Sequence, residues 1–240
     1  MKASLLVCPH DTANNPGRWY FITQYAAMER MPIHFELSLD FEEFHEKLGD
    51  VDIVYSNPQD AVRLVTEMGF TPVARPSGIY DEVVLIANPK LANPSLTAVN
   101  GQPLATVTSM LATAVGISML DRQSIKPSEI KSADTWLSVL QMVREGDVNY
   151  GFMYKDTFMG LSEDNQKSVT NVSISTEQSA FHSICLGPRL LPEQEKWQQL
   201  FLTMHENENG RMTLEELEIE KWLPVTSDEF DRIKALHGGS

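Results

Sequence analysis

The sequence is poor in cysteine, in positive charge and in long apolar runs. Each shortage excludes or disfavours a class of protein or partner. Only two cysteines, Cys8 and Cys185, occur in 240 residues, which excludes a disulfide scaffold. Lysine and arginine number 19 against 33 acidic residues, a formal charge of −14, which disfavours nucleic acid and anionic membranes as partners. No run approaches the ~20 apolar residues of a membrane span, so we expect no membrane insertion.

The common catalytic and cofactor signatures are also missing. The sequence has no Gly-x-Ser-x-Gly elbow, Walker loop, Gly-x-Gly-x-x-Gly, His-Glu-x-x-His or Cys-x-x-Cys. The six histidines show no metal-ligand spacing, and the eleven methionines are scattered. We therefore predict no catalytic residue, no metal and no cofactor.

The sequence does contain short strand and helix patterns in alternation. Apolar spacing and turn residues predict strands at 3–8, 33–39 and 51–55 and helices at 19–31, 40–48 and 59–68. Such alternation is typical of a parallel sheet with crossover helices. After a stretch rich in proline and asparagine, the pattern resumes with strands at 104–108 and 148–154 and helices at 109–120 and 135–145.

Two apolar segments, 82–87 and 181–186, are expected to lie at crossings between two lobes. We predict an α/β fold of two Rossmann-like lobes joined by two hinge crossings, near 86–89 and 183–186. The first lobe is discontinuous, at 1–87 and 185–240, and the second spans 88–184. The C-terminal part of the first lobe carries an amphipathic helix at 192–206 and an acidic helix at 213–220. Two crossings restrict the lobes to a hinge motion.

Small polar residues follow three predicted strands, at 10–15, 55–57 and 106–109. In open α/β sheets, ligands bind outside the carboxyl ends of the strands, near helix N-termini. Asn57 and Ser109 are also explained as helix caps. His10 adjoins Asp11 in the first turn and forms the one adjacent acid–base pair in a suitable loop.

Four longer stretches carry a family pattern: Val51-Asp-Ile-Val-Tyr-Ser-Asn-Pro-Gln-Asp-Ala, Glu82-Val-Val-Leu-Ile-Ala-Asn, Arg144-Glu-Gly-Asp-Val-Asn-Tyr-Gly-Phe-Met-Tyr and Trp222-Leu-Pro-Val-Thr-Ser-Asp-Glu-Phe-Asp-Arg-Ile. In this order and spacing they resemble the phosphate/phosphite/phosphonate-binding components of ABC transporters, a branch of the type 2 periplasmic-binding-protein fold. The resemblance implies an ABC permease or a histidine kinase as partner, and a periplasmic location. The sequence shows no signal peptide before its first strand, which implies the cytoplasm if Met1 is the native start.

The sequence departs from this family at the oxyanion-binding turn. Where relatives have Ser-Thr-Ser-Gly at a helix start, it reads Ser109-Met110-Leu111-Ala112, and Thr135-Trp136-Leu137 replaces Ser-His-Glu. Each lost hydrogen bond to a charged group forfeits about 1.5–3 kcal/mol, which argues against phosphonate itself. Met110 and Trp136 suit a ligand with an apolar or cationic portion, although Trp136 equally suits the core of the lobe.

We therefore predict a non-enzymatic, monomeric solute-binding protein or sensor module that closes two lobes over a small molecule. The residues expected around this ligand are Asp11, Asn14, Tyr55, Asn57, Tyr80, Ser109 and Trp136. Tyr80 is included because it precedes the crossing strand, where family members present an aromatic residue. One alternative is a cytosolic enzyme on the same fold, of the menaquinone-pathway type, with a chorismate-type substrate and His10 and Asp11 as acid–base pair. Another is the effector-binding domain of a larger regulator.

Overall fold

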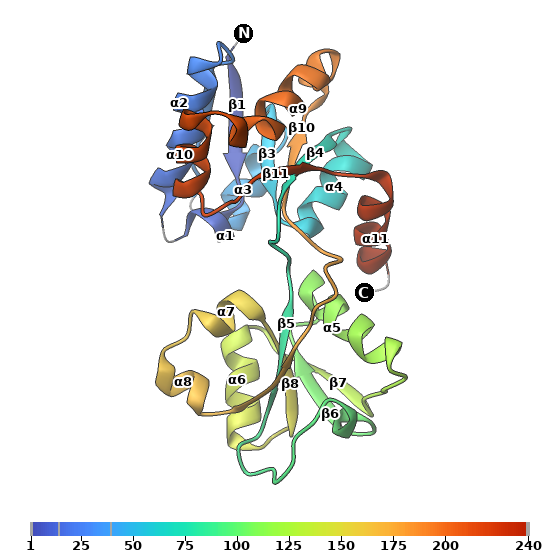
Figure 1. Ribbon diagram of the computed structural model, residues 1–240. Coiled ribbons are helices and arrows are strands. Elements are labelled where there is room, and N and C mark those ends of the chain that lie inside the picture. Colours follow the sequence, from blue (N-terminus) through green and yellow to red (C-terminus); the bar gives the residue numbers. More distant parts are fainter. Residues whose placement is uncertain (1, 14, 39, 239–240) are drawn as a thin grey trace. The chain divides into compact units, whose positions relative to one another are not determined.

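The computed structural model describes residues 2–13, 15–38 and 40–238, and the chain divides into two compact α/β units (Figure 1). Unit 1 comprises Met1–Ile79 and Phe181–Asp231, and unit 2 comprises Tyr80–Ala180 and Arg232–Ser240. Each unit has its own sheet with helices packed on it. The predicted α/β class with two lobes is confirmed.

In the described part of unit 1, six strands form one sheet in the order β11-β4-β10-β3-β1-β2. They are β1 (Ala3–Val7), β2 (Ile33–Glu36), β3 (Ile53–Ser56), β4 (Thr71–Pro76), β10 (Ser183–Leu186) and β11 (Trp222–Pro224). β1 is parallel to β2 and β3, β10 is antiparallel to β3 and β4, and β11 is antiparallel to β4. The carboxyl ends of β1, β3 and β4 therefore share one edge, here the unit-1 edge, with the amino ends of β10 and β11.

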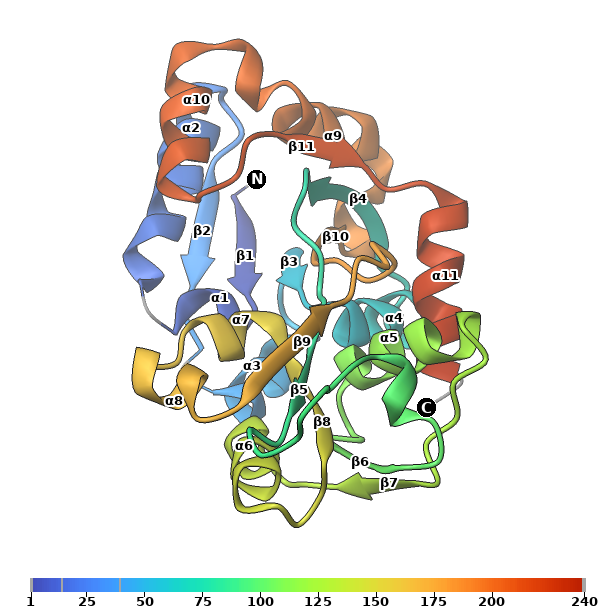
Figure 2. The same ribbon diagram turned by 60° about the horizontal axis from the view of Figure 1, so that its bottom comes forward.

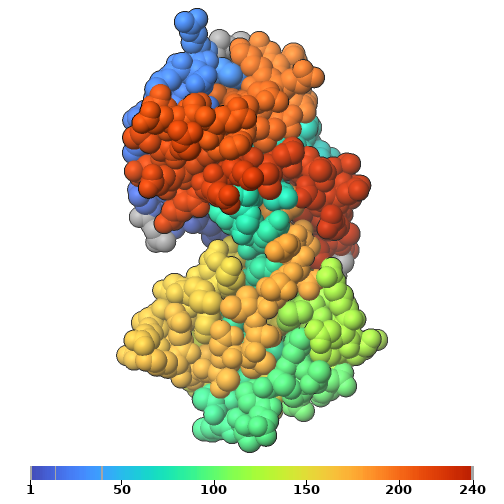
Figure 3. Space-filling view, viewed as in Figure 1, coloured from blue at the N-terminus to red at the C-terminus, as the bar shows by residue number. Residues whose placement is uncertain are grey.

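The helices of unit 1 cover this sheet and enclose an aromatic core. They include α1 (Pro9–Thr12), α2 (Tyr20–Met28), α3 (Phe41–Lys47), α4 (Pro58–Met68), α9 (Gln194–Leu202) and α10 (Glu208–Glu216). Helix α2 packs against both β2 and α10, as Figure 2 shows. The orange C-terminal helices cover much of the visible face of unit 1 in Figure 3. Trp19, Tyr25 and Trp222 are almost fully buried in the core beneath.

In the described part of unit 2, five strands form a sheet in the order β7-β6-β8-β5-β9. They are β5 (Val83–Ala87), β6 (Pro103–Thr106), β7 (Glu129–Ser132), β8 (Tyr150–Tyr154) and β9 (Thr170–Ile174). β6 is parallel to β7 and β8, whereas β5 is antiparallel to β8 and β9. The carboxyl ends of β6, β7 and β8 thus share one edge, here the unit-2 edge, with the amino end of β5.

Helices pack on both faces of the second sheet. They are α5 (Leu111–Arg122), α6 (Trp136–Glu145), α7 (Lys155–Met159) and α8 (Glu163–Lys167). Along β5, Val83 and Leu85 belong to one core cluster and Val84 and Ile86 to another, because successive strand residues point to opposite faces. This double burial explains the unbroken apolar run of β5.

Gly151 in β8 lets helix α6 approach the sheet closely, and it supports a stability prediction. A Cβ atom at this position would lie 2.8 Å from Val139 and 2.9 Å from Val143. We expect Gly151→Ala to lower the free energy of unfolding by about 1–3 kcal/mol, the usual cost of overpacking, in urea denaturation. Gly49→Ala is the matched control, because a Cβ there meets nothing within 4 Å. Equal stability of the two variants would contradict the close packing.

The boundary between the units differs from the predicted one. The prediction assigned residues 1–87 and 185–240 to the first lobe, with hinges near 86–89 and 183–186. Instead, β5 lies wholly inside the unit 2 sheet and β10 inside the unit 1 sheet, so the chain passes between units at 79–80 and 180–181. The prediction had two crossings, but the chain passes between units a third time at 231–232, inside helix α11 (Ser227–Gly238). Each apolar segment marks a sheet interior, and the passage lies just outside it.

Several elements differ from the sequence prediction for local reasons. Strand β4 contains Pro72 and Pro76, and edge strand β7 is mostly exposed, so neither shows a clear strand pattern. The helix predicted at 192–206 is shorter: a 3₁₀ segment, Pro188–Glu193, precedes α9. The helix predicted at 213–220 begins earlier, at Glu208, because the Asn207 side chain accepts a hydrogen bond from the Gly210 N–H.

Candidate ligand-binding site

An aspartate–histidine pair lies at the unit-1 edge. His182 Nδ1 and Asp11 Oδ2 are 2.9 Å apart, and their side chains are 7% and 20% exposed. Asp11 lies in the short helix after β1, and His182 directly precedes β10. Because β10 is antiparallel to its neighbours, the topology brings together two residues that are 171 positions apart.

The backbone of Asp11 is held by two further side chains. Arg18 Nη2 and Trp19 Nε1 each donate a hydrogen bond to the Asp11 carbonyl oxygen, at 3.2 Å. Arg18 also forms an ion pair with Glu218 at 3.0 Å. The carboxylate of Asp11 is therefore presented to His182 from an anchored main chain.

The aromatic ring of Tyr55 packs beside this pair. Its ring lies 4.8 Å from Trp19, 5.6 Å from His182 and 5.8 Å from Trp222, measured between ring centroids. The side chain belongs to the unit 1 core, with 3% of the residue exposed. Tyr55 therefore supports His182 by packing.

Asn57 caps a helix at the same edge. Its side chain accepts a hydrogen bond from the Asp60 N–H and donates to Asp60 Oδ2 and Cys8 Sγ, at 2.9, 2.7 and 3.5 Å. Asp60 also lies 2.8 Å from His45 Nε2. The structure thus gives Asn57 a capping role in α4, and a contact with ligand stays a prediction.

Neither cysteine supplies a reactive thiolate. Burial, with a smaller contribution from the negative charge of Asp11, raises the pKa of Cys8 to about 12. Burial raises the pKa of Cys185 to about 11. Both thiols are therefore protonated at neutral pH.

The unit-2 edge carries a group of hydroxyls between β6 and β7. Thr108 Oγ1 lies 2.7 Å from Ser132 Oγ, and the Ala133 N–H donates to the Thr106 carbonyl at 2.9 Å. Thr135 caps α6 by accepting a hydrogen bond from the Ser138 N–H. These contacts join the turn before α5 to the turn before α6.

Ser109 is not the helix cap that one sequence interpretation expected. It lies exposed in the turn before α5, whose N-cap position is occupied by Met110 without any side-chain cap. Helix α5 begins at Leu111, later than the predicted residue 109. The first N–H groups of α5 therefore have no capping side chain, which suits a negatively charged ligand.

Trp136 lies over the end of the second sheet. It is half-buried and packs against both core clusters of unit 2, which occupy opposite faces of the sheet. Trp136 is therefore a core residue, as one sequence interpretation expected, and contact between its remaining surface and a ligand stays a prediction.

Acidic groups occupy the neighbouring part of the unit-2 edge. The Tyr154 hydroxyl lies 3.0 Å from Asp81 Oδ1 and 3.2 Å from Asp156 Oδ2. Two carboxylates so close would repel an anion. This repulsion favours an oxyanion position at the hydroxyls between β6 and β7, away from β8.

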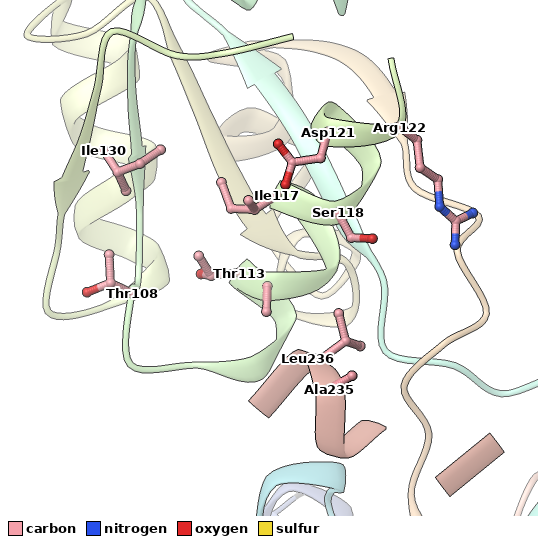
Figure 4. Close-up of a pocket in the computed structure, with 10 residues that line it drawn as sticks. Thr108, Thr113, Ile117, Ser118, Asp121, Arg122, Ile130, Ala235 and Leu236 are labelled. Atoms are coloured by element: carbon pink, nitrogen blue, oxygen red, sulfur yellow. The ribbon is translucent and has the colours of Figure 1, made fainter. Parts of the chain in front are cut away.

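A hollow of about 390 Å³ runs along helix α5 (Figure 4). Its lining includes Thr108, Ile117, Asp121 and Ile130, with Ala235 and Leu236 from the end of α11, which belongs to unit 2. Thr108 lines this hollow and also belongs to the hydroxyl group, so the two features adjoin.

The structure brings the predicted site residues together within each unit. Asp11, Tyr55 and Asn57 lie at the unit-1 edge, Ser109 and Trp136 at the unit-2 edge, and half-buried Tyr80 directly precedes Asp81 in unit 2. Asn14 lies outside the described residues. Sequence reasoning missed His182, although a single histidine within the predicted apolar segment 181–186 was a usable signal.

Several solved structures share the fold of this chain. Among similar solved structures are XAC2383 from Xanthomonas citri bound to chloride (14% identity, 99% of this chain, 96% of that chain, TM-score 0.69) and PhnD1 from Prochlorococcus marinus in complex with methylphosphonate (12%, 99%, 97%, 0.70). Another is the aliphatic sulphonate binding protein SsuA from Escherichia coli (10%, 99%, 85%, 0.70). At these identities the likeness shows a shared periplasmic-binding-protein fold.

The family follows from the sequence match. The model of the family described as "ABC transporter, phosphonate, periplasmic substrate-binding protein" matches residues 25–230, most of the chain. The chain belongs to this family of ABC transporter solute-binding proteins. Comparison with curated protein sequences gives no significant match. Within the described residues, no helix is long and apolar enough to cross a membrane.

Proposed function

We propose that this protein delivers a small organic oxyanion to an ABC permease, in the periplasm. Family membership supports the class of function. The observation that supports the ligand class is the uncapped start of α5 beside the Thr108–Ser132 hydroxyl pair. Hydroxyls and helix N–H groups hold an oxyanion without a cationic side chain.

The unit-1 edge is proposed to supply the second set of ligand contacts. The Asp11–His182 pair is polar and lies at the carboxyl ends of the parallel strands, where ligands of open α/β sheets bind. Ligand contacts from two lobes favour a closed state, because they are complete only when the lobes close. A fall in the radius of gyration on ligand addition, measured by small-angle scattering, tests this closure.

The enzymatic alternative gains no support. Its proposed acid–base pair was His10 and Asp11, but the Asp11 carboxylate bonds to His182, and the His10 ring packs edge-on against Phe41 at 4.9 Å. The family is one of binding proteins. A sensor role with a histidine kinase remains a second choice of partner for the same binding event.

A thermal-shift screen tests the proposed ligand class. Methylphosphonate and methanesulfonate are expected to raise the melting temperature, and the double variant Thr108→Ala/Ser132→Ala to reduce that shift strongly, because it removes both hydroxyls. Thr23→Ala is the matched control, since its hydroxyl bonds only locally, to the Tyr20 carbonyl. Absence of any shift with either anion would contradict an oxyanion ligand.

A further inference from the structure

Exposed apolar side chains stand at the unit-2 edge, where the hydroxyls lie. Met110 is 38% exposed at the N-cap of α5, and Leu137 is 56% exposed in the first turn of α6. Half-buried Trp136 precedes Leu137 and spans both faces of the sheet end. Water-exposed apolar groups that gather at one place mark a binding surface.

The two turns that carry these residues are directly connected. The Thr108–Ser132 hydroxyl contact and the Ala133–Thr106 backbone hydrogen bond join them, at 2.7 and 2.9 Å. Met110 follows Thr108 by two residues, and Trp136 follows Ser132 by four. In both turns, therefore, the Thr108–Ser132 pair is followed by apolar residues.

The position of Met110 is costly for the helix itself. N-cap positions favour Ser, Thr, Asp and Asn, whose side chains satisfy a free N–H group, and methionine offers none. Elsewhere in the described chain, Asn57, Thr135 and Asn207 cap their helices in the ordinary way. Cys8 and Trp19 also stand at helix starts without a side-chain cap, but both are buried, whereas Met110 is exposed. An exposed apolar residue at the start of α5 is explained if a ligand satisfies the N–H groups and its carbon skeleton covers the methionine.

We infer that the ligand is an amphipathic organic oxyanion, whose apolar part of several carbons lies on Met110, Trp136 and Leu137. This inference rests on the proposed function and narrows its ligand class. It predicts a preference for longer organic anions over inorganic phosphate and methylphosphonate, which have too little apolar surface to cover three such side chains.

A chain-length series tests the inference by titration calorimetry. Methyl-, propyl-, hexyl- and phenylphosphonate are the probes, and each fully buried methylene is expected to raise affinity about fourfold. Met110→Ala and Leu137→Ala are expected to remove most of this gain, so that the ratio of hexyl- to methylphosphonate affinity falls toward one. Met212→Ala is the matched control, because Met212 is 58% exposed on α10 of unit 1.

Tryptophan fluorescence gives an independent readout. Trp19, Trp197 and Trp222 are buried, so the half-buried Trp136 is the one most sensitive to a covering ligand. Hexylphosphonate is expected to shift the emission to shorter wavelength in the wild type and not in Trp136→Phe.

The outcomes separate this inference from the proposed function. If methylphosphonate binds and longer chains bind no better, the inference is wrong and the proposed function stands. If the gain with chain length persists in Met110→Ala and Leu137→Ala, the apolar part lies elsewhere and the assignment to these residues is wrong. If no phosphonate or sulfonate in the series binds, both are wrong.

Discussion

Glu229→Gln is expected to lower the free energy of unfolding by about 1.5–3 kcal/mol at neutral pH, because it removes the charged acceptor of a largely buried hydrogen bond from Arg75. Glu229 Oε1 lies 2.6 Å from Arg75 Nη2, and Arg75 is 8% exposed, with its guanidinium 5.0 Å from the Phe181 ring centroid. Glu229 also accepts a hydrogen bond from the Thr226 N–H in a capping box, so it ties the start of α11 to β4.

The ion pair between Arg18 and Glu218 provides a matched control. Both are arginine–glutamate pairs of unit 1, but the Glu218 side chain is 82% exposed. Solvent weakens such a pair, so Glu218→Gln is expected to change stability by less than about 0.5 kcal/mol in the same urea titration. Similar losses in the two variants would mean that burial of Arg75 does not decide the effect.

The contribution of Glu229 also has a defined pH dependence. Burial alone would raise the pKa of Glu229, but hydrogen bonds from Thr226 and Arg75 outweigh it and lower the pKa below the ordinary 4.5. The unfolded state then binds more protons, so this stabilisation is fully present above pH 4.5 and is lost as the pH falls through the folded-state pKa. The stability difference between wild type and Glu229→Gln is therefore expected to shrink below pH 4.5.

The sequence predicts the positions of the strands and the fold class better than it predicts which strands pair in a sheet. Alternation along 3–68 and the apolar runs at 82–87 and 181–186 mark strands correctly, because burial leaves a local signature in the residues themselves. Which sheet each run joins depends on contacts that are distant in sequence. β5 therefore belongs to unit 2, although the sequence analysis ended the first lobe at residue 87.

The candidate site shows the same division between local and distant information. A polar residue after a strand is visible in the sequence, which is why Asp11 and Ser109 are found. Whether such a side chain caps a helix depends on the local backbone geometry. The Asn57 side chain caps α4, whereas Ser109 lies just outside α5. His182 reaches Asp11 only through an antiparallel strand inserted from the far end of the chain, and no local pattern predicts that pairing.

Asp11→Ala is expected to lower stability by about 1.5–3 kcal/mol, because the buried imidazole of His182 loses a charged hydrogen-bond partner. Asp11→Asn keeps an acceptor oxygen within reach of Nδ1 and removes the charge, so a smaller loss is expected. The comparison therefore separates hydrogen bonding from charge. Thermal and urea denaturation measure both variants.

His45→Ala is the control that separates fold stability from ligand binding. It breaks the other aspartate–histidine pair of unit 1, His45 with Asp60 at 2.8 Å, where the histidine side chain is 39% exposed. If His182, held by Asp11, contacts the ligand, Asp11→Ala lowers methylphosphonate affinity at least tenfold, whereas His45→Ala leaves it unchanged. Unchanged affinity in Asp11→Ala, with its stability loss intact, would make the pair a purely structural bridge between α1 and β10. Calorimetry well below the melting temperature of each variant keeps the two effects apart, because every molecule titrated is then folded.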